Sequence, residues 1–518
     1  MKTQRAKKRF VPSNKNIILS LLVITIVTFT SFFYDEPYFL AYSQEGSGGS
    51  SSGLEVHPQT EAVTSTYDGL LKAPLIISQA AIVGGVFNHI IFQRVLNRIN
   101  TKHRINVENN NLQSQKKFFI ILVSCGIAIL ITGTSLIYLQ AFSLSIDLNT
   151  DVTTTFTILT STDVGTVWIL RIITASIIIA SSFLYYILEK TKIKKKRRRT
   201  MPSAEEHQDI QLENKRGIGI SKIFLYAIII IAGAICIFSN SLVSHNTALT
   251  FLPSLAISMD WLHFMAVAIW IGGLFYISAV LLDIIRTAAK VKIKFESYSS
   301  TSTRSDKIES AYFLALLLPY FSVIATISLG IIGITGLYMA WIHLHTAEAL
   351  FESSYGNILI IKLSAALPMV ILGAYHQLKL HHSLVEVASM SINTEGRNKK
   401  SPLLNSVNNN ISLDIYAKFR KTIKIESIIG IGVLFAASFL TITSPPHSST
   451  MMSHGQVAPF MTQTPLSESS SDLNEISSSL DSFAILTIIL LAGVGMSSAF
   501  YLRKSRQQLK KTAEYLQY

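Results

Sequence analysis

Long apolar stretches separated by polar and charged segments dominate the hydropathy pattern of the chain. Each runs for roughly 18 to 25 residues with almost no charge, the length that an α-helix needs to cross about 30 Å of hydrocarbon. Ten such segments can be delimited: 17–34, 74–93, 118–141, 166–188, 222–243, 259–283, 312–342, 357–379, 424–443 and 483–502. The pattern predicts an all-α, polytopic transmembrane helical bundle with eight core helices, one N-terminal and one C-terminal flanking segment.

The eight core segments form two sets of four that share features in the same order. The shared features are a Gly-Gly pair, a Thr-Gly pair, a glycine six positions before a basic residue, and a lysine 23 positions before a histidine. The matched positions are Gly84-Gly85 and Gly272-Gly273, Thr132-Gly133 and Thr335-Gly336, Gly165 with Arg171 and Gly356 with Lys362, and Lys222 with His245 and Lys424 with His447. Because four helices separate each pair, both copies have the same orientation, which predicts two parallel four-helix repeats, 74–248 and 249–447.

The regions outside the repeats have different compositions. Residues 1–45 carry a basic start and a long apolar run, which fits either a signal peptide or an N-terminal anchor helix. Residues 46–73 include GSGGSSSG and predict an extracytoplasmic flexible linker. Residues 448–482 predict an extracytoplasmic loop containing Met and His, and 483–518 an extra transmembrane helix with a basic cytoplasmic tail. The polar stretch 384–415 predicts a further loop.

Composition and charge agree with a membrane protein and argue against nucleic acid as a partner. Hydrophobic residues make up 49% of the chain and charged residues 15%, too little charge for the surface of a soluble protein of this length. With the N-terminus in the cytoplasm, all but three of the 45 Lys and Arg residues fall on the cytoplasmic side. This asymmetry follows the positive-inside rule, so the net charge of +14 indicates a lipid bilayer with anionic headgroups and no nucleic acid partner. Both termini are then cytoplasmic, provided the first segment is not cleaved.

The three remaining basic residues lie in or beside apolar segments, where charge is costly. They are Lys72, Arg171 and Lys362. We expect Arg171 and Lys362 to reach the outer interface or to pair with a carboxylate such as Glu426, and we favour such a structural role over contact with a ligand. Likewise Trp270, Gly272 and Gly273 indicate close helix packing, because no Rossmann or Walker spacing surrounds the glycines.

Histidine and methionine concentrate near the predicted outer ends of the second repeat and in the loop that follows it. The candidate metal ligands are His245, His263, Met259, Met339, His343, His345, His447, Met451, Met452 and His454. Met259 and His263 share one helix face, as do Met339 and His343, because each pair is four residues apart. Imidazole together with thioether suits copper as Cu(I) or Cu(II), whereas zinc more commonly recruits Cys or carboxylate. Any one of these residues fits equally as a gap-filler in the packing, but the cluster favours copper binding.

Two further histidines lie near the predicted inner side. His89 and His376 fit either the ligands of a b-type haem or an exit site for metal, and their spacing does not choose between these. The two cysteines, Cys125 and Cys236, form no CxxC motif.

The string Asp260-Trp261-Leu262-His263, followed by Trp270-Ile271-Gly272-Gly273-Leu274, resembles the CopD family of copper-resistance and copper-uptake membrane proteins. The resemblance covers roughly residues 70 to 447. Its other matches are Ser244-His245, Thr335-Gly336, Tyr355-Gly356 with Lys362, Glu426 with Gly430, Ser444-Pro445-Pro446, and Gly165 with Trp168 and Arg171.

The resemblance implies copper handling across the cytoplasmic membrane of a prokaryote, with import favoured, and places metal at His245 and His263. Many relatives use a CopC β-domain, for which residues 35–73 are too short, so a separate extracytoplasmic chaperone of CopC type is the implied partner. The chain carries no ATP-hydrolysis motif, and the hypothesis is a transporter rather than an enzyme. Two alternatives stay open: a membrane b-type haem or redox protein, and a non-transporting copper delivery or assembly factor.

Overall fold

The computed structural model describes residues 58–103, 112–198, 207–244, 253–286, 305–344, 348–380 and 402–443, with Pro445, Arg503 and Gln507. Within this part of the chain the regular secondary structure is helical and contains no strand. The flanking segments 17–34 and 483–502 and the loop 448–482 lie outside the described residues.

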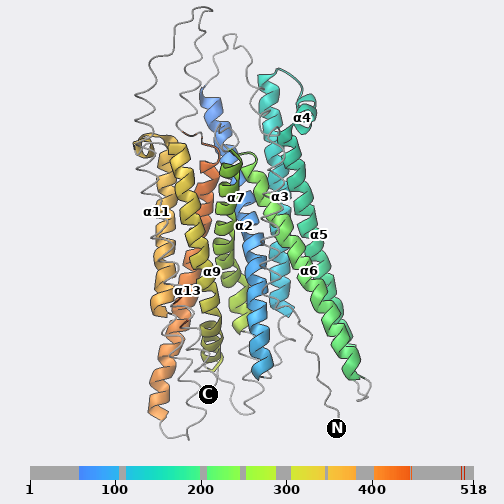
Figure 1. Ribbon diagram of the computed structural model, residues 1–518, viewed down its shortest axis with the longest axis vertical. Coiled ribbons are helices and arrows are strands. Elements are labelled where there is room, and N and C mark those ends of the chain that lie inside the picture. Colours follow the sequence, from blue (N-terminus) through green and yellow to red (C-terminus); the bar gives the residue numbers. More distant parts are fainter. Residues whose placement is uncertain are drawn as a thin grey trace, which may run out of the picture.

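The described helices follow one another in a single order along the chain. They are α2 (Pro58–His103), α3 (Leu112–Asp147), α4 (Val152–Thr160), α5 (Asp163–Arg198), α6 (His207–Ser241), α7 (Pro253–Tyr276) with the π-helix η4 (Ile277–Leu281), α9 (Ser305–Leu344), α10 (Ala349–Glu352), α11 (Ser354–Tyr375) with the π-helix η5 (His376–Leu380), and α13 (Pro402–Leu440). The long helices run side by side as one bundle (Figure 1). We call the end that carries α4 and α10 the upper end, as Figure 1 shows it, and the opposite end the lower end.

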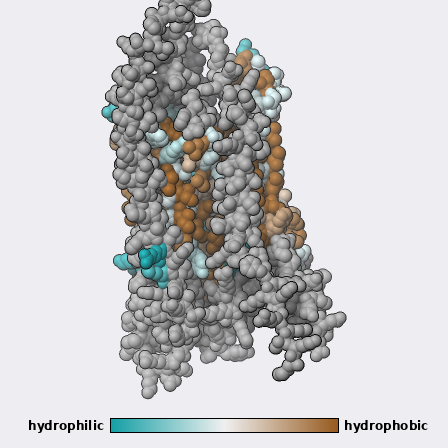
Figure 2. Space-filling model, viewed as in Figure 1, coloured by the Kyte–Doolittle hydropathy of each residue, from teal (hydrophilic) through white to brown (hydrophobic). Residues whose placement is uncertain are grey.

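Eight of the described helices are long and apolar enough to cross a membrane. Their spans are Asp68–Leu96, Gln115–Ile146, Val164–Thr191, Lys222–Ser241, Ser254–Arg286, Leu317–Leu344, Ser354–Tyr375 and Tyr416–Leu440, each overlapping one predicted core segment. On the face that Figure 2 shows, the coloured residues in the middle of the bundle are mostly hydrophobic, and hydrophilic ones lie nearer its ends. The predicted all-α, polytopic membrane bundle is confirmed.

Two helices extend beyond the apolar segments that predict them. α2 begins at Pro58, inside the stretch 46–73 that the sequence indicates as a flexible linker, and α13 begins at Pro402, inside the loop predicted for 384–415. Proline is favoured at the first position of a helix, where its missing N–H costs nothing. Hydropathy marks only the part of a helix that lies in lipid, so it does not detect these polar extensions.

Two short helices, α4 and α10, lie in equivalent loops at the upper end. Asp151 caps α4, accepting a hydrogen bond from the Thr153 backbone N–H at 3.0 Å, and Ser353 caps α11 directly after α10, accepting from the Gly356 N–H at 2.9 Å. Hydrogen bonds from Thr153 also hold the pKa of the exposed Asp151 carboxyl below its usual range. Because both helices are shorter than a membrane span, the apolar pattern does not reveal them.

The centre of the bundle is the contact between α2 and α7, which lie between α3, α5 and α6 on one side and α9, α11 and α13 on the other (Figure 1). A Cβ atom added to Gly84 would lie 1.9 Å from the Ala268 carbonyl oxygen. One added to Gly272 would lie 2.0 Å from the Ala80 carbonyl oxygen. Each glycine therefore lets the two backbones touch, as small residues do between helices in lipid.

Equivalent positions of the two predicted repeats make equivalent contacts. Gly84 and Gly272 face one another across the centre. A Cβ on Gly165 would meet the Leu159 carbonyl oxygen of α4 at 2.3 Å, and one on Gly356 would meet the Leu350 carbonyl oxygen of α10 at 2.2 Å. These correspondences support a duplication of one four-helix unit.

The two halves differ in how tightly their third helix packs. α3 packs along α5, whereas α9 has no comparable contact with α11 in the described part of the chain. On α11 only Tyr355, Gly356 and Met369 are buried. The second half is therefore the looser one, and Asp260, His263 and Lys362 in its upper part are half-buried.

Candidate metal centre

A group of polar side chains from four helices lies in the upper part of the second half. It consists of Ser241 at the end of α6, Asp260 and His263 on α7, Thr335 on α9, and Tyr355 and Lys362 on α11. We call this group the upper cluster. Trp261 fixes α7 in place, because its indole N–H donates to the Ala234 carbonyl of α6 at 3.1 Å.

The protonation of the His263 ring follows from its partner. Nδ1 lies 2.9 Å from the Thr335 hydroxyl oxygen, and that hydroxyl donates to the Ile331 carbonyl at 2.7 Å. Since the Thr335 proton is directed at its own helix, its oxygen accepts a proton from Nδ1 of the neutral ring. In this tautomer Nε2 carries the lone pair, the form in which a histidine binds a metal.

Gly336 provides the room for this ring. A Cβ at position 336 would lie 3.3 Å from Cε1 and 3.7 Å from Nδ1 of His263. The ring therefore rests against the backbone of α9, and the Thr-Gly pair both orients His263 and makes space for it.

Asp260 and Lys362 bring opposite charges into the same region. The Asp260 carboxylate on α7 interacts electrostatically with the Lys362 ammonium on α11. Ser241 lies beside Asp260, and its buried hydroxyl makes no hydrogen bond of regular geometry to any described residue. The upper cluster thus combines an imidazole, a carboxyl group and the hydroxyl of Ser241 beside it.

The predicted metal ligands divide into those that the structure places and those outside its described part. Met259 and Met339 are half-buried on α7 and α9. His343 is buried on α9, with its ring centroid 5.7 Å from that of Tyr355. The others, His245, His345, His447, Met451, Met452 and His454, lie outside the described residues. Among the side chains that are described, no three of the types His, Cys, Asp and Glu form a metal-sized group.

Four of the candidate ligands, Met259, His263, Met339 and His343, lie on α7 and α9 of the second repeat. When the two repeats are aligned on Gly84 and Gly272, the residues Leu71, Lys72 and Leu75 of the first repeat correspond to Met259, Asp260 and His263 of the second. When they are aligned on Gly133 and Gly336, the residues Leu136 and Gln140 of the first repeat correspond to Met339 and His343 of the second. At these positions the first repeat therefore carries no residue that suits copper.

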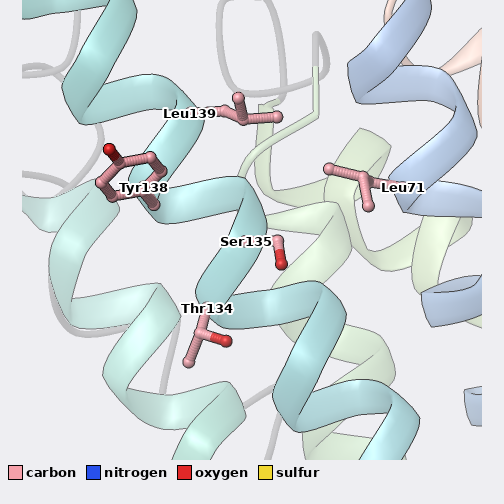
Figure 3. Close-up of a pocket in the computed structure, with 5 residues that line it drawn as sticks. All are labelled: Leu71, Thr134, Ser135, Tyr138 and Leu139. Atoms are coloured by element: carbon pink, nitrogen blue, oxygen red, sulfur yellow. The ribbon is translucent and has the colours of Figure 1, made fainter.

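The corresponding place in the first repeat is a surface hollow. It has a volume of about 380 Å³ and lies between α2 and α3, lined by Leu71, Thr134, Ser135, Tyr138 and Leu139. Leu139 of α3 points toward Leu71 of α2, and Ser135 lies on the same side of α3 (Figure 3). This lining offers hydroxyl groups and apolar surface but no imidazole, thioether or carboxylate ligand.

Arg171, the counterpart of Lys362, is buried against α6. Its Nε donates to the Ser239 hydroxyl at 2.7 Å, and Nη2 donates to the Asn240 side-chain oxygen at 3.0 Å. The guanidinium also lies 4.1 Å from the centroid of the Trp168 ring. Arg171 thus has protein partners for its charge, and it lies within electrostatic range of Lys72 just as Lys362 does of Asp260.

The other structural positions lie along the contact between the halves. Trp270 is buried on α7. A Cβ on Gly273 would lie 2.6 Å from Nδ2 of Asn88, whose amide donates to the Gly84 and Ile269 carbonyls. These residues pack α2 against α7.

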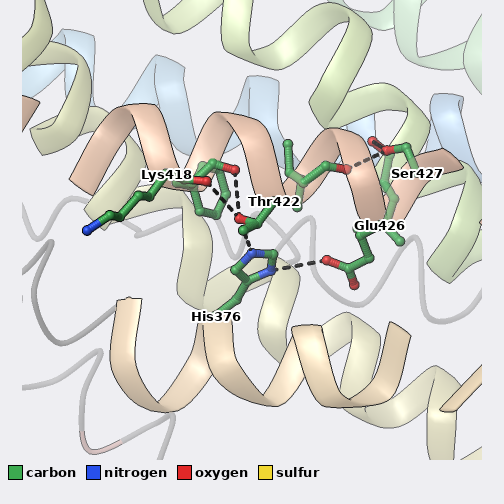
Figure 4. A network of polar contacts seen from close by, with 8 residues as sticks. His376, Lys418, Thr422, Glu426 and Ser427 are labelled. Atoms are coloured by element: carbon green, nitrogen blue, oxygen red, sulfur yellow. Dashed lines mark hydrogen bonds and ion pairs between the residues drawn. The ribbon is translucent and has the colours of Figure 1, made fainter. Parts of the chain in front are cut away.

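Both histidines considered for haem have protein partners on both ring nitrogens. His89 Nδ1 lies 3.0 Å from the Tyr276 hydroxyl and Nε2 lies 2.8 Å from the Tyr226 hydroxyl. His376 Nδ1 lies 3.1 Å from Oε2 of Glu426 and Nε2 lies 2.6 Å from the Thr422 hydroxyl (Figure 4). Axial ligation by either would first break these contacts. Glu426 therefore pairs with His376 near the lower end, and the carboxylate near Lys362 is Asp260.

Comparison with known proteins finds a similarity within the second half of the bundle. The family model described as Copper resistance protein D, CopD, matches residues 315–440, which contain the membrane part of α9 and all of α10, α11 and α13. No curated protein and no solved structure matches the chain significantly. The match confirms the CopD resemblance, although it does not include α7 and its Asp260-Trp261-Leu262-His263 string.

Proposed function

We propose that this CopD-family membrane protein moves copper ions across the cytoplasmic membrane of a prokaryote, in the direction of import. The upper end is then extracytoplasmic, and the lower end, toward which the basic segments lie, is cytoplasmic, as the positive-inside rule requires. With an uncleaved first segment, both termini are cytoplasmic.

The observation that carries this proposal is the contact between Nδ1 of His263 and the Thr335 hydroxyl, which leaves Nε2 for a metal on the helix face shared with Met259. Met451, Met452, His454 and His447 would capture copper outside the membrane. Ligand exchange would then pass it to His245, His263 and Met259, and onward to Met339 or His343. Transfer between ligands of similar strength keeps the ion from ever being bare in a medium of low dielectric constant.

The first test is copper accumulation in cells that express the wild type or the double variant His245→Ala/His263→Ala. We expect accumulation and bound copper to fall at least about tenfold, because ligands of one ion are removed. Ser258→Ala is the matched control, since its hydroxyl donates only to the Ser254 carbonyl of the same helix. Equal copper in variant and wild type would remove both histidines from the mechanism. Binding without accumulation would instead support a delivery or assembly factor.

A second prediction concerns the residue that orients His263. Thr335→Val keeps the shape of the side chain but removes the oxygen that accepts from Nδ1. We expect copper affinity, measured by competition with a chromogenic chelator, to fall about 10- to 100-fold, as for loss of other groups that orient a metal-binding histidine. Thr326→Val is the control, because Thr326 donates only to the Ser322 carbonyl on α9. Unchanged affinity in Thr335→Val would show that His263 does not bind copper through Nε2.

A further inference from the structure

The short helix α4 at the upper end has an outer surface without charge. Its nine residues consist of threonine and apolar residues only. Thr155 and Leu159 are buried where α4 packs on α3 and α5, whereas Phe156 is 40% exposed and Ile158 is 45% exposed. None of these residues has a role in the copper path proposed above.

Several threonine hydroxyls of α4 bond to carbonyl groups of the same helix and its cap. Thr157 donates to the Thr153 carbonyl and Thr160 to the Thr157 carbonyl, both at 2.9 Å. The buried Thr155 donates to the Asp151 carbonyl at 3.1 Å. Because a hydroxyl that donates to its own helix no longer needs water as its acceptor, these groups add little polarity to the outer surface. Such a surface is compatible with lipid.

The depth of α4 in the membrane follows from its contact with α5. A Cβ on Gly165 would lie 2.3 Å from the Leu159 carbonyl oxygen, so the last turn of α4 is level with Gly165. Lys190 begins the basic run at the lower end of α5. From Gly165 to Lys190 a straight α-helix extends about 38 Å at about 1.5 Å per residue. This length exceeds roughly 30 Å of hydrocarbon but fits within the roughly 40–45 Å of a bilayer with its headgroups. α4 therefore lies at the level where acyl chains meet headgroups.

The outer surface of α4 continues a surface that already faces lipid. On α3 the exposed side chains of Ile131, Tyr138, Phe142 and Ile146 lie along one stripe of the membrane span, and Leu148 is exposed just after the helix. α4 lies beside the upper ends of α3 and α5, on the side away from α7 (Figure 1). The apolar surface of the span thus extends upward to α4.

The equivalent helix of the second half has a different surface. α10 begins directly after the exposed Glu348 and ends with the exposed Glu352, and Phe351 between them is exposed as well. The interior of a bilayer cannot replace the hydration of a carboxylate. α10 therefore presents charge to the aqueous side, where α4 presents none.

We propose that α4 is a membrane-surface helix, which lies in the leaflet at the upper end and contacts phospholipid through Phe156 and Ile158. Its partner is the part of the phospholipid between the charged headgroup and the acyl chains, which accepts apolar side chains of a helix lying parallel to the membrane. The contact holds the upper ends of α3 and α5 at the membrane surface. This inference goes beyond the proposed function, because it does not depend on the movement of copper.

The test uses the full chain in phosphatidylcholine vesicles and places tryptophan at exposed phenylalanines. In Phe156→Trp we expect the fluorescence added to that of the wild type to fall at least about twofold when the acyl chains carry bromine near their ester groups, because this quenching requires contact with lipid. Phe183→Trp, at an exposed position in the membrane span of α5, is the lipid control. Phe351→Trp on α10 is the aqueous control, and iodide in the water should quench it.

The two controls set a scale for the ratio of quenching by brominated lipid to quenching by iodide. A ratio for Phe156→Trp close to that of Phe183→Trp would support the proposal. A ratio close to that of Phe351→Trp would overturn it, because α4 would then lie in water.

A measurement on the wild-type chain keeps the proposal testable if the tryptophan variants do not fold. A carbene precursor dissolved in the lipid is activated by light, and the sites of insertion are located by mass spectrometry. We expect insertion at Phe156 and Ile158 to be at least about tenfold above that at Glu352, and comparable with that at Ile131 of α3. Insertion no greater than at Glu352 would contradict the proposal. Neither measurement uses copper, so failure of the proposed function would leave both results unchanged.

Discussion

Replacing Gly272 with alanine is expected to destabilise the protein by about 3 kcal/mol or more, the upper range for overpacking a tight contact. The added methyl group would lie 2.0 Å from the Ala80 carbonyl oxygen and 3.0 Å from the Gly84 Cα. Both neighbours are backbone atoms, so no side-chain rotation relieves the clash. α2 and α7 would have to separate, and their contact is the centre of the bundle.

The chain offers a matched control on α13. Gly432 is also a glycine within a membrane helix, but a Cβ at this position would meet nothing within 4 Å. Gly432→Ala is expected to leave the protein unchanged or to stabilise it by up to about 1 kcal/mol, the ordinary preference of a helix for alanine. Thermal unfolding in detergent, followed by the fraction of monodisperse protein, distinguishes the two. Equal midpoints for both variants would mean that α2 and α7 do not touch at this glycine.

The eight spans were predictable because the bilayer fixes their length. A helix that crosses about 30 Å of hydrocarbon needs some 20 apolar residues, and the sequence shows eight such core segments where the described helices lie. The short helices α4 and α10 have no such requirement and leave no comparable pattern. Hydropathy likewise does not predict the polar extensions of α2 and α13, because it detects only the part of a helix that lies in lipid.

The side-chain pairs were harder to predict, because periodicity gives the face of a helix but not its partner. Glu426 was the carboxylate considered for Lys362, but it pairs with His376 near the other end. The repeat pattern contains the information needed to predict which carboxylate lies near Lys362. Asp260 stands at the position equivalent to Lys72, and Lys362 at the position equivalent to Arg171, so electrostatic proximity in one half predicts the same proximity in the other.

The orientation of His263 could not be predicted from spacing. The Thr-Gly pair at 335–336 appears in the sequence only as a repeat feature and a family match. The structure shows that Thr335 binds the ring and Gly336 makes room for it. Which of the predicted soft ligands join His263 depends on His245 and the loop after α13, which lie outside the described residues.

Replacing His89 with leucine is expected to destabilise the bundle by about 4 kcal/mol, because it leaves two tyrosine hydroxyls without their partner. His89 on α2 lies 3.0 Å from the Tyr276 hydroxyl on α7 and 2.8 Å from the Tyr226 hydroxyl on α6, so one ring joins three helices from both halves. It is 1% exposed and stacks on Phe118 of α3 at 4.4 Å. Water cannot easily replace the imidazole there.

A double-mutant cycle separates the free-energy cost of leaving a hydroxyl without its partner from the cost of the lost packing. Tyr226 keeps Tyr185 beside it, with ring centroids 5.0 Å apart, so Tyr276 is the residue to change. His89→Leu/Tyr276→Phe is expected to recover about 1–2 kcal/mol relative to the sum of the single variants, since the unsatisfied hydroxyl is removed together with its partner. Ser182→Ala, a buried hydroxyl that bonds only the Ile178 carbonyl of its own helix, is the control and should cost about 1 kcal/mol or less. Strict additivity in the cycle would mean that His89 and Tyr276 do not interact, and would return His89 to the set of histidines free to bind a cofactor.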